Sequence, residues 1–293
     1  MRTWKTTVMK FLAGLAIVVV LLGVVEIAIS SYTEKIFANA ILTNPQIHTR
    51  PEVAVKSFPN LFKVPDGRTG GLLINLNDAP HASPDIPRAN VQVEYSNLRF
   101  DQHDLFAGQL HDFSFGEGTG RVYISGSALA EYSGIGDLQF QAADNASPAG
   151  TGEDKALLTG TLNLPCGSDG PHPVHVEVRA HVFFWKEGKR LEIDPEKLEK
   201  FTDTSKHLAP AQCHLNDALT QHVFKRLSLS LRVPSLPLGI VPQLAFAQAG
   251  NLVIVGPTAQ SPITGKETAR YPGGTSTQAR WENLTNYFKF APQ

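Results

Sequence analysis

Apolar residues fill one continuous segment near the N-terminus and alternate with polar residues along much of the remaining chain. The segment Phe11–Val25 has no charged residue, and Glu26 separates it from a second apolar patch, Ile27–Ile29. A helix needs about 20 mostly apolar residues to cross the hydrocarbon core of a bilayer, and Phe11–Ile29 supplies about 19. The charged residues before this segment are all basic, which favours a cytoplasmic N-terminus. The pattern therefore predicts a membrane-directed helix, with the chain after it outside the cytoplasm.

Two fates of this helix are compatible with the sequence. Ala28-Ile29-Ser30 resembles the small-residue site at which secretory signals are cleaved. The length of the apolar run instead favours retention as a signal anchor. In either case we expect residues 1–30 to form the targeting segment, and the following domain to lie in the cell envelope, on the extracytoplasmic side of the plasma membrane.

A helical period continues beyond the targeting segment. Ser31–Thr43 carries an apolar stripe spaced as on one face of a helix. Asn44-Pro45 should end this helix, because a residue before proline avoids the α region. The stripe consists of Ile36, Phe37, Ala40 and Ile41.

Period-2 alternation then predicts antiparallel strands with one apolar face. The clearest strand is Val174–Phe184, which would span about 36 Å when extended. Val91–Tyr95 and Leu227–Leu231 alternate in the same way. The apolar faces of these strands consist of Val91, Val93, Tyr95, Val174, Val176, Val178, Ala180, Val182, Phe184, Leu227, Leu229 and Leu231.

Two later segments carry helical signals. Asp194-Pro195-Glu196 predicts a helix N-terminus, with proline at the first helical position. A further helix is predicted to start near Asn216, because Leu219 and Val223 recur four residues apart. Strands still far outnumber helices, so we expect an α+β fold. Residues 257–293 are rich in Thr, Ser, Pro and Gly and are predicted to form a poorly ordered extension, with Trp281–Phe290 able to dock back.

Composition and motifs argue against several classes of function. The net charge of −1 provides no basic footprint for nucleic acid. His175 and His181 share a strand face but lie about 20 Å apart along it, too far to bind one metal ion. The glycines of Gly116–Gly120 fit a hairpin turn rather than a phosphate-binding loop, since no parallel βαβ unit surrounds them. We therefore expect no cofactor, no metal site and no catalytic residue.

Two polar features leave alternatives open. Cys166 and Cys213 are the only cysteines, and in an exported protein they favour a disulfide over buried free thiols. Asp101, His103 and Asp104 cluster after a predicted strand, where they could serve a cell-wall hydrolase or form an ordinary polar loop.

The one-sided strands admit two interpretations. A trough lined by such a face could hold an acyl chain of sixteen carbons, whose burial is worth about 12 kcal/mol before ordering costs. The same face could instead pack on the helices, which would make the domain a membrane-anchored scaffold or interaction module with no lipid ligand. Alternation alone does not separate the two.

Three stretches of the chain resemble one family. They are Pro51–Leu61 (PEVAVKSFPNL), Leu236–Ile240 (LPLGI) and Gly250–Ile254 (GNLVI). Together they resemble the LmeA-like phospholipid-binding proteins of actinobacterial cell envelopes, over roughly Ser31–Gly256. The chain departs from the family pattern at Ser57, where glycine is usual. It also departs in the loop 144–154, in the tail beyond residue 256 and in its two cysteines.

The resemblance implies a tubular lipid-binding arrangement, in which a highly curved antiparallel sheet wraps around the long N-terminal helix and a second helix comes late. On that basis residues 31–256 form the lipid-binding domain, and the helical stripe and strand faces named above line its trough. The implied ligand is a phospholipid, with phosphatidylinositol as a candidate, and the implied role is support of envelope lipid or lipoglycan assembly. The membrane is contacted through the N-terminal helix, and protein partners are unknown.

Overall fold

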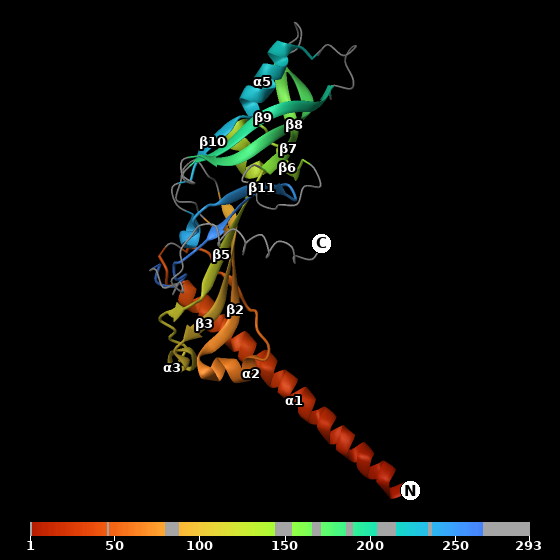
Figure 1. Cartoon of the computed structure of the whole chain (residues 1–293), viewed down its shortest axis with the longest axis vertical. Coiled ribbons are helices and arrows are strands. Elements are labelled where there is room, and N and C mark those ends of the chain that lie inside the picture. Colours follow the sequence, from red (N-terminus) through yellow and green to blue (C-terminus); the bar gives the residue numbers. More distant parts are fainter. Residues whose placement is uncertain are drawn as a thin grey trace. The chain divides into compact units, whose positions relative to one another are not determined.

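The fold combines one long helix, two antiparallel sheets and one late helix (Figure 1). The computed structural model describes residues 2–45, 47–79, 88–143, 154–165, 171–185, 190–203, 215–233 and 236–265. The predicted α+β class is confirmed, with α1 (Arg2–Ile41) at the start and α5 (Asp217–Leu227) near the end. The predictions for Cys166, Cys213, most of the loop 144–154 and Trp281–Phe290 fall outside the described residues.

Short helical turns and strands make up the rest of the described chain. The short helices are α2 (Asn60–Lys63), η1 (Val64–Asp66), α3 (Gln102–Phe106), η2 (Ser127–Leu129), α4 (Ala130–Ser133) and η3 (Pro237–Gly239). The strands are β1 (Glu52–Val55), β2 (Arg68–Ala79), β3 (Ala89–Phe100), β4 (Phe113–Ser114), β5 (Glu117–Ser125), β6 (Gln139–Ala142), β7 (Asp154–Pro165), β8 (Pro171–Trp185), β9 (Arg190–Asp203), β10 (Leu229–Arg232), β11 (Leu244–Gln248) and β12 (Asn251–Pro257).

The described strands are divided between two sheets. The first has the order β1-β2-β3-β5-β12-β11, with β4 also paired to β3. The second has the order β10-β9-β8-β7-β6. The predicted strand Val91–Tyr95 lies in β3 and the predicted strand Val174–Phe184 lies in β8, so these two apolar faces belong to different sheets.

The chain forms two compact units. Unit 1 comprises Met1–Asn75, Glu94–Gly118 and Gln260–Arg270, and unit 2 comprises Leu76–Val93, Thr119–Ala259 and Tyr271–Gln293. β2, β3 and β5 each contribute residues to both units.

The core of unit 1 forms around the second half of α1. Ile36, Phe37, Ala40 and Ile41 are all buried, which confirms the predicted helical stripe. The ring of Phe37 meets Phe113 edge-on at a centroid distance of 5.3 Å. Such pairs add to the energy of simple burial. The stripe thus fixes α1 to the strands of unit 1.

Residues just beyond the first sheet complete the core of unit 1. Ser261 and Ile263 are buried. The Asp112 carboxylate accepts hydrogen bonds from the hydroxyls of Ser261 and Thr264, at 2.5 and 3.0 Å. The described chain therefore remains packed for several residues past the Gly256 boundary that composition indicated.

The core of unit 2 lies on the inner face of the second sheet. The alternating residues Val174, Val176, Val178, Ala180 and Val182 of β8 are fully buried, as predicted. α5 contacts β9 and β7, and β11 contacts β6, β7 and β8. Val223 and Leu227 of α5 are buried, and Asn216 caps the helix by accepting from the Leu219 amide at 2.9 Å. Leu227 ends this helix rather than starting a strand, so the predicted alternation holds only for Leu229 and Leu231 in β10.

The helix predicted at Asp194-Pro195-Glu196 is wrong, because these residues lie inside β9. The pairing of β8 with β9 shifts register twice, between Glu177 and Val178 and between Arg179 and Ala180. Each shift leaves one residue of β9 without a partner position in β8. Proline is tolerated inside a sheet at such an irregularity, because a ladder hydrogen bond is already missing there. The shifts also increase the spacing between inward-facing residues of β9 from two residues to three. A spacing of three is close to the spacing of residues on one face of a helix.

The turn predicted at Gly116–Gly120 is also wrong. The Gly116 amide donates to the Ser96 carbonyl at 2.9 Å, and the following residues continue as β5. A Cβ at Gly120 would lie 2.3 Å from Cγ1 of Ile240. Glycine is therefore needed in this strand for the close approach of Ile240, not for a reversal of the chain.

A single methyl group at Gly256 should destabilise unit 2. A Cβ there would lie 1.8 Å from the Val241 carbonyl oxygen, a backbone atom that cannot swing away. We expect Gly256→Ala to lower the free energy of unfolding by about 3 kcal/mol, the upper range for overpacking. Urea denaturation of the purified chain would measure the change.

Gly136→Ala is the matched control, because a Cβ at Gly136 meets no atom within 4 Å. It should stay within about 0.5 kcal/mol of the wild type. Equal stability of both variants would contradict the packing described for β12.

Candidate functional site

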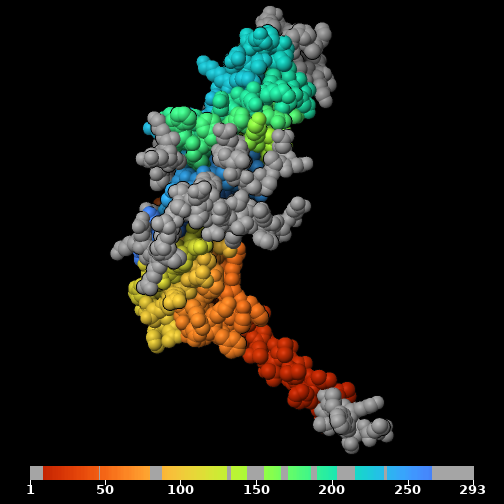
Figure 2. Space-filling view, viewed as in Figure 1, coloured from red at the N-terminus to blue at the C-terminus, as the bar shows by residue number. Residues whose placement is uncertain are grey.

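α1 combines an exposed apolar half with a buried half. Met9–Val25 is exposed throughout, with Phe11 at 71% and Val25 at 42%. Met9–Ile41 has a mean hydropathy of 2.8 over its most apolar window and is long enough to cross a membrane. It is the one helix in the described part of the chain with these properties, which a signal sequence near an N-terminus shares. Figure 2 shows α1 leaving the orange and yellow surface of unit 1 as a bare rod.

Glu26 fixes the start of the buried half. Its carboxylate oxygens accept hydrogen bonds from the backbone amides of Asn60 and Leu61, at 2.5 and 2.8 Å. These are the first amides of α2, which have no partner inside a helix. The Asn60 side chain returns the contact by donating to Ser30 Oγ at 2.9 Å. The acid inside the apolar run is therefore one of the polar links between α1 and the domain.

The stretch Pro51–Leu61 is the segment that holds α1. β1 lies within it and contacts α1, and the Glu34 carboxylate accepts from the Val55 amide at 3.0 Å. Ser57, which stands where glycine is usual in the resembling family, hydrogen-bonds Asn60 Oδ1 and Thr69 Oγ1. Its hydroxyl thus ties the segment to β2.

The residues predicted to line a lipid trough fall into two groups. The stripe of α1 and Tyr95 belong to unit 1, where Tyr95 is fully buried and its hydroxyl donates to the Gln260 carbonyl at 3.1 Å. The remaining residues belong to unit 2. Among them, β9 brings the predicted residues of β8 and β10 into line. Leu229 pairs with Ile193, which pairs with Val182, and Leu231 and Phe184 are aligned in the same way through Leu191.

The inner face of β8 is closed in the structure. Each of its residues from Val174 to Val182 on that face is 0% exposed, whereas Phe184 is half-buried. A side chain with no exposure to a water-sized probe borders no open channel. An acyl chain could therefore reach these residues only if whatever packs on this face moved away from it.

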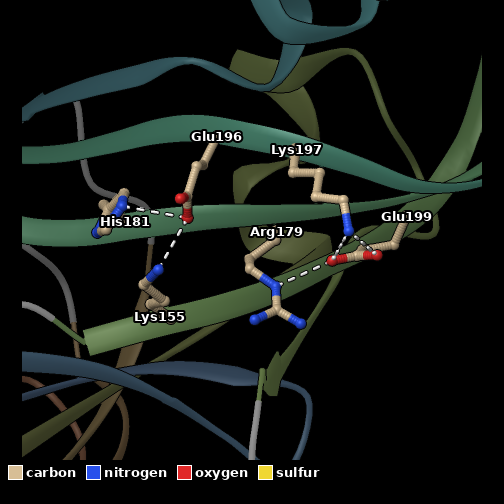
Figure 3. A network of polar contacts seen from close by, with 6 residues as sticks. All are labelled: Lys155, Arg179, His181, Glu196, Lys197 and Glu199. Atoms are coloured by element: carbon tan, nitrogen blue, oxygen red, sulfur yellow. Dashed lines mark hydrogen bonds and ion pairs between the residues drawn. The ribbon is translucent and has the colours of Figure 1, made fainter.

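The outer face of the same sheet carries two charge clusters (Figure 3). Lys155 and His181 both point to the Glu196 carboxylate, at 3.1 and 3.2 Å. Arg179 and Lys197 both point to Glu199, each at 3.0 Å.

Glu196 and Glu199 are the two residues of β9 that have no partner position in the register with β8. A hydrogen bond from the Lys155 ammonium lowers the pKa of the Glu196 carboxyl, and one from Lys197 lowers the pKa of Glu199. The predicted polar face of β8 is therefore an ion-paired, solvent-accessible surface.

Polar clusters elsewhere have structural roles. Asp101 caps α3 by accepting from the amides of His103 and Asp104, and Asp104 pairs with His111 at 3.1 Å. In the described ranges, no group of three or more His, Cys, Asp or Glu side chains is placed to hold a metal ion. A polar hollow of about 710 Å³ in unit 1 is lined by Pro65–Arg68 and Arg99–His103.

The comparisons identify the class of protein that these elements form. The model of the LmeA-like phospholipid-binding family matches residues 24–256, and the chain belongs to this family. The match begins within the exposed part of α1 and runs through the last strand, so it includes both sheets. Neither the comparison with curated proteins nor that with solved structures gave a match.

Loss of the Glu26 carboxylate should loosen α2. Hydrogen bonds to a charged group are worth about 1.5–3 kcal/mol each. Because Glu26→Ala removes two of them, we expect it to destabilise the local structure by about 3 kcal/mol. Hydrogen exchange at the Asn60 and Leu61 amides should accelerate accordingly. Mass spectrometry of the exchanged full chain would measure it.

Glu117→Ala serves as the control, because Glu117 is an exposed acid of unit 1 away from α1. It should leave exchange at α2 unchanged. Protection of the two amides in Glu26→Ala at the wild-type level would refute the link.

The clusters on the outer face should make stability depend on pH. A carboxyl whose pKa is lower in the folded state stabilises the fold above its unfolded pKa, near 4.3, and the contribution disappears as pH falls through the folded value. We therefore expect wild-type stability to fall more steeply below about pH 5 than that of Glu196→Gln/Glu199→Gln. Urea denaturation at a series of pH values would compare the slopes, and parallel curves would speak against the ion pairs.

Proposed function

We propose that the protein is a membrane-tethered phospholipid-binding protein of the cell envelope, with its domain on the extracytoplasmic side. The observation that carries this proposal is the family match over residues 24–256, which joins a lipid-binding domain to the apolar helix. The basic residues before the helix support a cytoplasmic N-terminus. Tethering keeps the domain at the surface from which its ligand comes.

The proposed binding surface is the inner face of the second sheet. β8 presents its longest uninterrupted apolar row, and burial of an acyl chain there needs no polar motif. Because that face is covered, binding requires whatever packs on it to move away, and we propose that α5 or β11 moves when lipid enters. Phosphatidylinositol and a role in envelope lipid or lipoglycan assembly belong to this proposal through the family resemblance.

One observation favours a second candidate function. The complete burial of the β8 face is what a packed scaffold domain would have. In that case the domain would bind protein partners and hold no lipid. The two candidates differ in whether phospholipid stabilises the folded chain.

Phospholipid should bind to and stabilise the full chain in detergent. A ligand that binds only the folded state at a hundred times its Kd stabilises it by about 2.7 kcal/mol. After delipidation, we therefore expect added phospholipid to raise the melting temperature, and native mass spectrometry to detect bound lipid. Parallel measurements with phosphatidylinositol, phosphatidylglycerol and phosphatidylethanolamine would rank the headgroups.

A pair of variants distinguishes lipid that is bound around α1 from lipid that is bound inside the domain. Val178→Asp places a carboxylate on the buried face, whereas Thr202→Asp places one on an exposed position of the neighbouring strand. Only the first should abolish the thermal shift, with circular dichroism checking that each variant folds. A wild-type chain that neither carries phospholipid nor is stabilised by it would favour the packed scaffold.

A further inference from the structure

Three phenylalanines of unit 1 project into solvent from separate segments. Phe58 is 80% exposed, Phe62 of α2 is 67% exposed and Phe106 of α3 is 51% exposed. Phenylalanine is among the residues most often buried. Several exposed together mark a surface that is covered by something else.

α2 and α3, which carry Phe62 and Phe106, lie at the end of unit 1 from which α1 leaves (Figure 1). Phe58 and Phe62 flank Asn60 and Leu61, whose amides are bound by Glu26 of α1. Phe106 lies beside Tyr32 of α1.

The contact between Phe106 and Tyr32 is close. Their rings stack at a centroid distance of 6.4 Å, and the Tyr32 hydroxyl donates to the Phe106 carbonyl at 3.0 Å. Glu26 and Tyr32 are six residues apart, which is about 9 Å along a helix and about 120° around it. The phenylalanines therefore flank α1 on two sides, and we call Phe58, Phe62 and Phe106 the aromatic collar.

The position of the collar along α1 coincides with the end of the apolar run. The exposed run Met9–Val25 is about 26 Å long at 1.5 Å per residue. With Ile27–Ile29 it reaches the thickness of a hydrocarbon core, about 30 Å. The collar contacts α1 between Glu26 and Tyr32. These contacts lie on both sides of Ile29, where the apolar run ends, and so the collar lies at the boundary of hydrocarbon and headgroups.

The charges near the collar are of both signs. Lys63 of α2 and Arg68 are basic, and Asp66 and Asp104 are acidic. Such a surface has no strong attraction for anionic lipid alone. Insertion of phenyl rings at the boundary of headgroups and acyl chains, as in interfacial amphipathic segments, needs no net charge.

We propose that the aromatic collar inserts into the outer boundary of the bilayer that α1 crosses, and so docks unit 1 on the membrane surface. The occupant of the collar is the lipid surface itself, because the exposed apolar helix continues directly from it. This inference rests on the proposed membrane tether but not on lipid binding within the domain.

Tryptophan reporters in the full chain test the docking. Phe62→Trp and Phe106→Trp are made in a background in which all three native tryptophans, Trp4, Trp185 and Trp281, are replaced by phenylalanine. The variants are reconstituted into phosphatidylcholine vesicles with acyl chains that are either plain or brominated near the headgroup. We expect bromine to reduce the emission of both reporters.

Leu215→Trp is the matched control, since Leu215 is 51% exposed but belongs to unit 2. Its emission should be the same in both kinds of vesicle. Melting temperatures near the wild-type value would confirm that the exposed substitutions leave the fold intact.

Flotation of the vesicles separates the two ways in which the test can fail. Chains that float with the vesicles while Phe62→Trp and Phe106→Trp are no more quenched than Leu215→Trp would overturn the docking and leave the tether standing. Chains that do not float would overturn the tether, and the docking with it. Quenching of both collar reporters, with Leu215→Trp unaffected, supports the proposal.

Discussion

The contact between Glu26 and the first amides of α2 is the constraint on which the arrangement of α1 against α2 depends. Glu26 is the first residue of α1 after the fully exposed run, and the helix becomes buried from Thr33 onward. A carboxylate within an apolar helix is costly in hydrocarbon, and at this position the amides of α2 satisfy it. The same contact holds Asn60 and Leu61 against the helix, and so it positions Phe58 and Phe62, which flank them.

Much of the fold could be predicted from the sequence, because burial on one face of an element leaves a regular period. The stripe of α1 and the alternation of β8 follow the rules for an amphipathic helix and a half-buried strand, and both are buried as expected. β9 could not be predicted in this way. Its two register shifts put Pro195, Leu198 and Phe201 on one face at intervals of three, and the proline after Asp194 completed the resemblance to a helix start.

The parts of the site that sequence reasoning missed depend on contacts between distant residues. Glu26 and Asn60 are 34 positions apart, and no local pattern links them. The available signal was an acid that interrupts an otherwise apolar run. The closure of the β8 face could not be predicted either, because alternation says which side of a strand is apolar but not what covers it. The roles of Gly120 and Gly256 likewise follow from single close approaches across the fold.

α1 runs from Arg2 to Ile41 as a single helix, with no break where it enters unit 1. In the proposed tethered state, unit 1 and the membrane-crossing segment would therefore be joined by continuous helix, with no loop between them. A bilayer thicker or thinner than the apolar run would be accommodated by tilting of this helix. Because Phe37 and Ile41 are packed at the far end of the same rod, any such tilt would incline the aromatic core together with the span. In the proposed tethered state, the orientation of unit 1 would therefore depend on the thickness of the bilayer.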